Sequence, residues 1–239
     1  MSETAAGKSV VRERPVIAID GPAGAGKSTL AAHLARKFGF LNLETGAMYR
    51  ALALKAIEND LAFEDAAALM DLAEYTRIAL EPQADGNRVV LDGVDVSRRV
   101  RDADVTEAAS KVSVHPVLRA WMVTQQRKLG EQGGVVMEGR DIGTAVFPDA
   151  EVKIFLDAAP EVRGSRRFRQ RLPEQVKVTE ESVLKELRAR DERDRNRAES
   201  PLRPAEDAVV LDSTAMTLEE VLAAAEEIVR SHVEAAKLH

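Results

Sequence analysis

The sequence has no cysteine among its 239 residues. This absence excludes disulfide bonds and thiolate metal sites, and it suits a reducing compartment such as the cytoplasm. No apolar run approaches the roughly 20 residues that a membrane-spanning helix needs. Residues 1–14 also lack the apolar segment of a secretory signal. We therefore expect a cytoplasmic protein without a membrane partner.

Positive charge is in deficit, with 34 lysines and arginines against 40 aspartates and glutamates and a formal net charge of −6. General nucleic-acid binders are more often basic, so we expect no nucleic-acid polymer as partner. Histidine is scarce, and its spacing is not that of metal ligands. We therefore assign no chemistry to His33, His115, His232 and His239.

Apolar strands alternate with amphipathic helices along the rest of the chain. Val16–Asp20 begins with four apolar residues in a row, which is typical of a strand buried on both faces. A helix is expected from Ser28 to Phe38, ending at Gly39. Further strands are expected at 40–43, 135–137, 152–156 and 209–211. One helix is expected after Thr45, one through Trp121 and Arg127, and one over 160–198. A last helix is expected after a capping box of Thr217 and Glu220. This order predicts an α/β fold with a parallel sheet.

One segment breaks that alternation. Between Arg77 and Val96, the turn dipeptides Asp85-Gly86 and Asp92-Gly93 flank a short apolar run. We expect three short antiparallel strands there, inserted into the main domain. Residues 1–14 have no periodic apolar face, so we expect a disordered tail whose removal leaves the thermal midpoint and the activity unchanged.

The strongest motif follows the first strand. It is a complete G-x-x-x-x-G-K-[ST] phosphate-binding loop, extended by Thr29, between an expected strand and an expected helix. Glycines let backbone N–H groups surround phosphate oxygens, the lysine reaches the β- and γ-phosphates, and the Ser28 hydroxyl can bind Mg²⁺. The expected ATP-binding residues are Gly21, Pro22, Ala23, Gly24, Ala25, Gly26, Lys27, Ser28 and Thr29. The D-x-x-G and N-K-x-D elements of regulatory GTPases are absent, which argues against a molecular switch.

Further motifs resemble those of bacterial cytidylate kinases, members of the nucleoside-monophosphate kinase group of P-loop NTPases. The resemblance covers nearly everything from Pro15 to the C-terminus, and the combination of motifs is specific. They are Glu44-Thr45-Gly46-Ala47-Met48-Tyr49-Arg50, Ala109-Ser110-Lys111-Val112, Pro116-Val117-Leu118-Arg119, Glu138-Gly139-Arg140-Asp141-Ile142-Gly143-Thr144, the stretch from Arg190 to Arg197, and Leu211-Asp212-Ser213-Thr214.

This resemblance implies a parallel five-stranded core, an antiparallel β insert that binds the monophosphate, and a mobile lid. It implies transfer of the γ-phosphoryl group of ATP to CMP or dCMP with Mg²⁺ as cofactor, in pyrimidine nucleotide metabolism. We expect a monomer whose partners are these nucleotides. The expected parts are a tail at 1–14, a core at 15–45, 110–159 and 198–239, the insert at 46–109, and an arginine-rich lid at 160–197.

The resemblance also implies a role for each matching residue. Ser110, Arg119 and Asp141 would recognise the cytosine edge, and Thr45, Tyr49, Arg50 and Arg140 would line the acceptor phosphate site. Arg190 and Asp194 would contact the sugar hydroxyls, and Arg197 would face the phosphates. Lys27, Arg166 and Arg193 would be catalytic, although neighbouring arginines from Arg163 to Arg171 leave the register of the lid group open.

Independently of the family, Arg190, Asp194 and Arg197 share a helix face by their i, i+4, i+7 spacing. They are part of a strongly arginine-rich segment in an acidic protein, which suits a ligand with several phosphate charges. A solvated helix with ion pairs along its surface is an equally good interpretation of that segment alone. Gly139-Arg140-Asp141 follows a strand, where ligands bind in open parallel sheets. Asp157 also ends a strand, and we expect it to cap the following helix rather than to bind Mg²⁺.

Two rival functions remain open. A related P-loop kinase could use UMP, AMP or a small hydroxy acid as acceptor. A non-enzymatic protein could bind ATP without turning it over.

Overall fold

A computed structural model describes residues 12–83, 86–171 and 179–236. The expected dipeptide Asp85-Gly86 lies partly outside these residues. The central sheet contains β1 (Val16–Asp20), β2 (Leu41–Glu44), β6 (Val135–Glu138), β7 (Val152–Asp157) and β8 (Val209–Asp212). All four neighbouring pairs are parallel, in the order β2-β6-β1-β7-β8. The expected α/β fold with a parallel five-stranded core is confirmed.

Alternate residues of the central strands enter two separate hydrophobic clusters. Val16 and Ala18 of β1 face the helices α2 (Thr45–Glu58), α4 (Ala103–Val112) and α5 (Pro116–Gly130). Ile17 and Ile19 face α1 (Lys27–Phe38) and α8 (Leu218–Ala236) on the other side. Successive side chains of a strand point to opposite faces, so a strand covered on both faces must be apolar throughout. This explains why β1 has the sequence VIAI.

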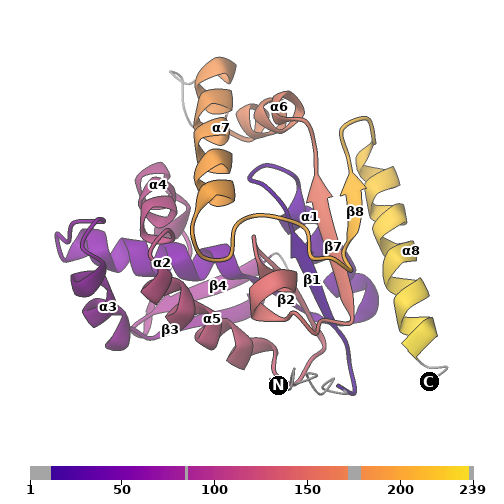
Figure 1. Cartoon of the computed structure of the whole chain (residues 1–239), viewed down its shortest axis with the longest axis horizontal. Coiled ribbons are helices and arrows are strands. Elements are labelled where there is room, and N and C mark those ends of the chain that lie inside the picture. Colours follow the sequence, from indigo (N-terminus) through magenta and orange to yellow (C-terminus); the bar gives the residue numbers. More distant parts are fainter. Residues whose placement is uncertain (1–11, 84–85, 172–178, 237–239) are drawn as a thin grey trace, which may run out of the picture.

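The insert forms its own antiparallel sheet, β3 (Ile78–Gln83), β4 (Gly86–Leu91) and β5 (Val94–Asp95). The three expected strands are therefore present. The insert also contains α3 (Ala66–Glu74), the 3₁₀ turn η1 (Arg99–Arg101) and α4, whose helical structure the sequence pattern did not reveal. In Figure 1 this part lies to the left of the central sheet. The buried side chain of Asn87 anchors it to β2, accepting from Glu44 N at 2.8 Å and donating to Asn42 O at 2.7 Å.

The arginine-rich region contains two helices, α6 (Pro160–Arg171) and α7 (Glu180–Asn196). In Figure 1, α6 lies near the carboxyl end of β7, and α7 stands beside α6 on the side away from β8. Thr179 and Ser182 form a capping box at the start of α7. The expected capping box of α8 is confirmed, with Glu220 N donating to Thr217 Oγ1 and Thr217 N donating to Glu220 Oε2.

Asp157 does not cap the following helix. Its carboxylate accepts from the N–H group of the next residue, Ala158, and α6 begins at Pro160. The amide of Ala159 instead donates to Thr214 Oγ1, so the loop after β8 supplies this contact. The expectation was wrong because two residues, Ala158 and Ala159, separate Asp157 from the first residue of α6.

The expected tail docks at its last residues. Arg12 donates to Asp149 Oδ2 at 2.7 Å and Glu151 Oε1 at 3.1 Å, and its guanidinium lies 5.3 Å from the Phe147 ring centroid. Arg14 donates to Gly39 O and lies over the Phe40 ring. The expectation of a disordered tail over residues 1–14 therefore does not hold for Arg12 and Arg14, and residues 1–11 lie outside the described part of the chain. The pattern search failed here because charged side chains, and not an apolar face, make the contacts.

We consequently expect Arg12→Ala to lower the stability of the folded protein. The Arg12 side chain is only 5% exposed, and its loss leaves two carboxylates without their cation. A cost of about 1–3 kcal/mol, seen as a lower midpoint in thermal unfolding, is expected for losing charge-assisted hydrogen bonds of this kind. Turnover at a temperature well below the midpoint should be unchanged. Arg88→Ala, which removes exposed ion pairs to Glu81 and Asp95, is the control and should leave the midpoint unchanged. Equal midpoints for the two variants would contradict the docking of Arg12.

Candidate active site

The phosphate-binding loop joins β1 to α1 at the carboxyl edge of the sheet. Gly21, Gly24 and Gly26 have φ angles of 147°, 75° and 101°, which favour glycine. A Cβ on Gly21 would also collide with the carbonyl oxygen of Leu156 on β7. The strand before the loop and the helix after it, which confirm a phosphate-binding motif, are thus both present.

Lys27, the lysine of this loop, is buried at 6% exposure, and its Nζ donates to Pro22 O at 2.7 Å. Burial lowers its pKa, and the nearby guanidinium groups of Arg140 and Arg190 lower it further. Phosphate oxygens would have the opposite effect, because an adjacent anion favours the ammonium form. The lysine is therefore placed where an anionic ligand would stabilise its charge.

A carboxylate that sequence analysis did not single out lies beside this loop. Glu138, the last residue of β6, is 4% exposed, and burial raises its pKa, with Glu44 adding to the effect and hydrogen bonding to Ser28 opposing it. Within the described residues its Oε1 atom has no hydrogen-bond partner. A buried carboxylate oxygen beside an exposed Ser28 hydroxyl fits the hard oxygen ligands of Mg²⁺. Its position at the end of the strand next to β1 was the available sequence signal.

Asp20 is a second buried acid missed by the sequence analysis. Its carboxylate accepts from Ile142 N at 2.8 Å and Gly143 N at 2.7 Å. Burial raises its pKa to about 6, although these two amides oppose the shift. Asp20 thereby fixes the π-helical turn η2 (Ile142–Val146) that follows Asp141. Such turns recur at functional sites.

The three expected base-recognition residues lie in or next to one network. Arg119 on α5 donates to Asp141 Oδ2 and, at 3.2 Å, to Ser113 O, while its guanidinium lies 5.6 Å from the Tyr49 ring centroid. Ser110 on α4 is buried and is linked to Ser113, whose hydroxyl donates to the Ser110 carbonyl. The three residues thus come from different parts of the chain: Ser110 from α4, Arg119 from α5 and Asp141 from the loop after β6.

The four expected acceptor-phosphate residues surround the carboxyl ends of β2 and β6. Thr45 Oγ1 donates to Glu138 O at 2.7 Å, and Arg50 pairs with Glu44 at 2.5 Å. Arg140 donates through Nε to Asp194 at 2.8 Å. The Tyr49 hydroxyl is buried, and burial raises its pKa.

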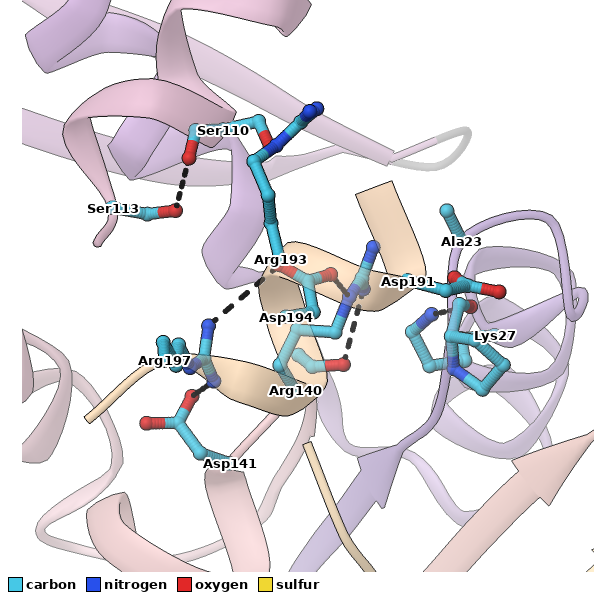
Figure 2. Close-up of polar contacts among 12 residues, drawn as sticks. Ala23, Lys27, Ser110, Ser113, Arg140, Asp141, Asp191, Arg193, Asp194 and Arg197 are labelled. Atoms are coloured by element: carbon cyan, nitrogen blue, oxygen red, sulfur yellow. Dashed lines mark hydrogen bonds and ion pairs between the residues drawn. The ribbon is translucent and has the colours of Figure 1, made fainter. Parts of the chain in front are cut away.

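The expected face of α7 points into the site. Figure 2 shows Asp194 beside Arg140 and Arg197 beside Asp141, with ion-pair distances of 2.8 Å and 3.7 Å. Burial alone would raise the pKa of Asp194, but Arg140 and Arg190 hold it below its ordinary value. Burial lowers the pKa of Arg190 to about 10, so it stays charged near neutral pH. The interpretation of α7 as a solvated helix is therefore wrong for this face, although it holds for Arg188, whose side chain is 59% exposed.

Two residues expected to be catalytic, Arg166 and Arg193, donate hydrogen bonds to residues outside the phosphate-binding loop. Arg166 donates to Ser213 Oγ at 3.1 Å and Ser213 O at 3.0 Å, and Arg193 donates to Ser110 Oγ at 3.1 Å. The arginines whose charges lower the pKa of Lys27 are instead Arg140 and Arg190. A third arginine, Arg163, is almost fully buried and contacts the phosphate loop itself. The arginine-rich sequence alone does not show which of these side chains contacts Ser213, which contacts Ser110 and which contacts the phosphate loop.

Buried polar atoms without partners gather in this region. Buried donors and acceptors are nearly always hydrogen-bonded, so a cluster of exceptions indicates a polar ligand. Within the described chain they include Tyr49 OH, Arg50 Nε, Arg119 Nε, Glu138 Oε1, Arg190 Nε and Arg197 Nη2. Because four of the six belong to arginines, the ligand they suit is an anion with several oxygen acceptors.

Comparison with known proteins shows which family the chain resembles. A family profile described as cytidylate kinase matches residues 17–231. The cytidylate kinase of Aeromonas hydrophila is 49% identical over 208 residues, covering 87% of this chain and 90% of that protein. The cytidylate kinase of Vibrio cholerae is 46% identical over 217 residues, covering 91% of this chain and 96% of that protein. Among solved structures, a shikimate kinase from Acinetobacter baumannii in complex with shikimate is similar at a TM-score of 0.45 and 15% identity, covering 95% of this chain and 97% of that chain.

No helix in the described ranges is long and apolar enough to cross a membrane. The profile match spans most of the chain, and the two relatives are nearly half identical over almost all of it. The chain belongs to the cytidylate kinase family.

Proposed function

We propose that the chain transfers the γ-phosphoryl group of ATP to CMP or dCMP, giving ADP and CDP or dCDP. The observation that carries this proposal is the arginine cluster without full partners, located beside an intact phosphate-binding loop. ATP occupies the loop from Gly21 to Thr29, with Lys27 at the β- and γ-phosphates. The acceptor occupies the region between α7 and the insert. One bond to the γ-phosphorus forms from the acceptor phosphate oxygen, and the bond to the leaving ADP oxygen breaks.

Charge neutralisation is the main task of the site, because phosphoryl transfer needs in-line positioning and stabilised oxygens more than covalent help. Thr45, Tyr49, Arg50 and Arg140 hold the acceptor phosphate, and Arg197 faces the phosphates from α7. The acceptor oxygen is already largely ionised near neutral pH, so no strong general base is needed. This explains why the site can function without a catalytic histidine.

Recognition of cytosine rests on Ser110, Arg119 and Asp141. The Asp141 carboxylate can accept from the exocyclic amine, and the Arg119 guanidinium, which Asp141 orients, can donate to the ring. Arg190 and Asp194 contact the sugar hydroxyls. Four of the five residues, Ser110, Arg119, Asp141 and Asp194, are already placed by contacts within the protein, which supports recognition of the base with little rearrangement.

Magnesium fits the oxygens near the loop. Ser28 would ligate the ion, and the Glu138 carboxylate, whose Oε1 atom has no hydrogen-bond partner among the described residues, would help to hold it directly or through water. When bound, Mg²⁺ neutralises phosphate oxygens and keeps them in line. Glu138 must be ionised for this role, and the positive ion would itself lower the raised pKa.

Domain roles complete the proposal. Residues 46–109 form the monophosphate-binding insert, and residues 160–197 form a lid that excludes water, the competing acceptor. Arg166 and Arg193 would approach the transferring phosphoryl group only if the lid changes position from that seen here. We further propose a cytoplasmic monomer whose partners are nucleotides and not a nucleic-acid polymer or a membrane, which the acidic net charge supports.

A panel of acceptors tests the function. We expect kcat/KM for CMP and dCMP to exceed that for UMP, AMP and GMP by at least about tenfold, because a site built to bond the exocyclic amine leaves buried groups unpaired when the amine is missing. ADP release would be measured with each monophosphate and with shikimate. Equal turnover of CMP and AMP would exclude the proposed base recognition, and preference for shikimate would favour the hydroxy-acid rival. ATP binding without release of ADP for any acceptor would favour the non-enzymatic rival.

A further inference from the structure

Arg163 on α6 is the largest fully buried side chain of the described structure that carries a charge, at 1% exposure. Each of its three nitrogens has a different partner. Nε donates to Ala158 O at 2.8 Å, Nη1 donates to Ala23 O at 2.9 Å, and Nη2 pairs with Asp191 Oδ2 at 2.6 Å. Ala23 belongs to the phosphate-binding loop and Asp191 belongs to α7. A single guanidinium therefore joins the loop, α6 and α7.

Backbone packing reinforces this junction. Gly24, the residue after Ala23 in the loop, has a φ angle of 75°, and a Cβ built on it would lie 3.3 Å from both Cβ and the carbonyl oxygen of Arg163. The loop thus lies directly on the backbone of α6 at Arg163. Movement of that residue cannot leave the loop undisturbed, because protein interiors are close-packed.

The pair is poorly explained by stability alone. Burying two charges costs several kcal/mol, and a well-packed apolar pair is often as stable or more stable. Asp191 is itself only 6% exposed, and its Oδ1 atom has no hydrogen-bond partner among the described residues. An incompletely satisfied buried ion pair is better suited to fixing relative positions than to adding net stability.

The position of Asp191 on α7 connects the ion pair with Arg163 to the acceptor site. Arg190, the preceding residue, and Asp194, three residues later, lie on the side of α7 that faces Arg140 and the acceptor site. Asp191 pairs with Arg163, which donates to Ala23 O in the loop, while Figure 2 shows Asp194 and Arg197 directed toward Arg140 and Asp141. One rigid helix therefore contacts the donor loop through Asp191 and Arg163, and the acceptor site through its other residues.

We propose that Arg163 and Asp191 are positioning residues that couple the two substrate sites, so that ATP in the loop and CMP against α7 strengthen each other's binding. The proposal rests on the proposed function. Arg163 acts through the Ala23 carbonyl and Asp191 acts through Arg163. Neither residue needs to touch the reacting atoms. Thermodynamic linkage makes the effect reciprocal. CMP should tighten ATP binding by the same factor by which ATP tightens CMP binding.

The test compares CMP binding with and without a non-hydrolysable ATP analogue and Mg²⁺. In the wild-type protein the analogue should tighten CMP binding by about fivefold or more, the lower end of typical coupling between sites. In the double variant Arg163→Met with Asp191→Leu, which removes both charges together, this ratio should fall below about twofold. CMP affinity of the nucleotide-free protein should stay within about twofold of wild type, because the acceptor contacts are unchanged.

A matched pair of surface residues supplies the control. Arg188 on α7 pairs with Glu161 on α6, so it joins the same two helices without touching the loop, and both side chains are about 60% exposed. Arg188→Met with Glu161→Leu should keep the wild-type ratio. Loss of coupling in this control would assign the effect to general helix packing and overturn the proposal.

One further variant, Asp191→Asn, protects the test against misfolding. Arg163→Met alone leaves Asp191 charged and buried without a cation, and it can fail to fold. Asp191→Asn keeps both carbonyl contacts of Arg163, so it should fold and show a reduced ratio. If folded Asp191→Asn and the folded double variant both keep wild-type coupling, the pair is structural and the proposal is wrong. If the wild-type protein does not phosphorylate CMP, the proposed function fails; if it does so without coupled binding, only this inference fails.

Discussion

Replacing Lys27 with alanine should reduce phosphoryl transfer by about a hundredfold or more, the largest effect we expect from one substitution. Lys27 is the only charged residue of the loop from Gly21 to Thr29, and the proposed function places its ammonium group at the transferring phosphoryl group. Such preorganised charges are worth several kcal/mol in an enclosed site. Initial rates at saturating ATP and CMP would measure the loss. Because the missing interaction is strongest in the transition state, kcat should fall more than KM rises.

Folding should survive this change, and the unfolding midpoint provides the check. Lys27 is buried with its pKa lowered by burial, so removal of its charge relieves a desolvation cost, while the loss of its bond to Pro22 O opposes that gain. Lys37→Ala on the same helix is the control, since this lysine is 45% exposed and pairs only at the surface with Glu226. Near-normal turnover by a folded Lys27→Ala protein would contradict the role of the loop.

Arg197→Ala should cost about 2–4 kcal/mol of transition-state stabilisation, the scale of removing one charged donor from an enclosed phosphoryl site. The guanidinium is held by Ser200 O through Nε at 2.6 Å, which leaves its other nitrogens directed at Asp141, Asp194 and the expected phosphates. The comparison of kcat/KM with wild type, together with the unfolding midpoint, separates catalysis from stability.

Two further variants on α7 make that comparison specific. Asp194→Ala should mainly raise KM for CMP, because a sugar contact is made equally in the ground and transition states. Arg188→Ala, on the exposed side, should change kcat/KM by less than about threefold. If Arg197, Asp194 and Arg188 variants all keep normal kinetics, α7 does not contribute to the site.

The sequence predicted the elements whose cause is local. The phosphate loop, the buried strand before it and the turn residues of the insert each follow from the preferences of a few neighbouring residues. The structure has the loop, the strand and the turn at Asp92-Gly93. The helices α3 and α4 were not anticipated, because their short apolar patterns are interrupted by small and charged residues. Their burial comes from packing on α2 and α5, which is tertiary information.

The sequence predicted many of the residues that form the site, but not the contacts that they make with one another. The motifs contained Arg140, Asp141 and the functional face of α7, and all of these meet in the structure. The spacing of the arginines did not reveal that Arg163 donates to the phosphate loop while Arg166 donates to Ser213, since the two lie three residues apart on one helix. Glu138 and Asp20 were overlooked because their importance comes from burial, and burial depends on the whole fold.

The anchoring of Asn87 also bears on solubility. The strand β2 is an outer strand of the central sheet, and such strands offer unpaired backbone groups to other chains. Asn87 occupies two of these groups, Asn42 O and Glu44 N, as a neighbouring strand would. The insert thus serves the folded protein as a guard against edge-to-edge aggregation in addition to any part in acceptor binding, and shortening it would expose β2 to association between copies of the chain.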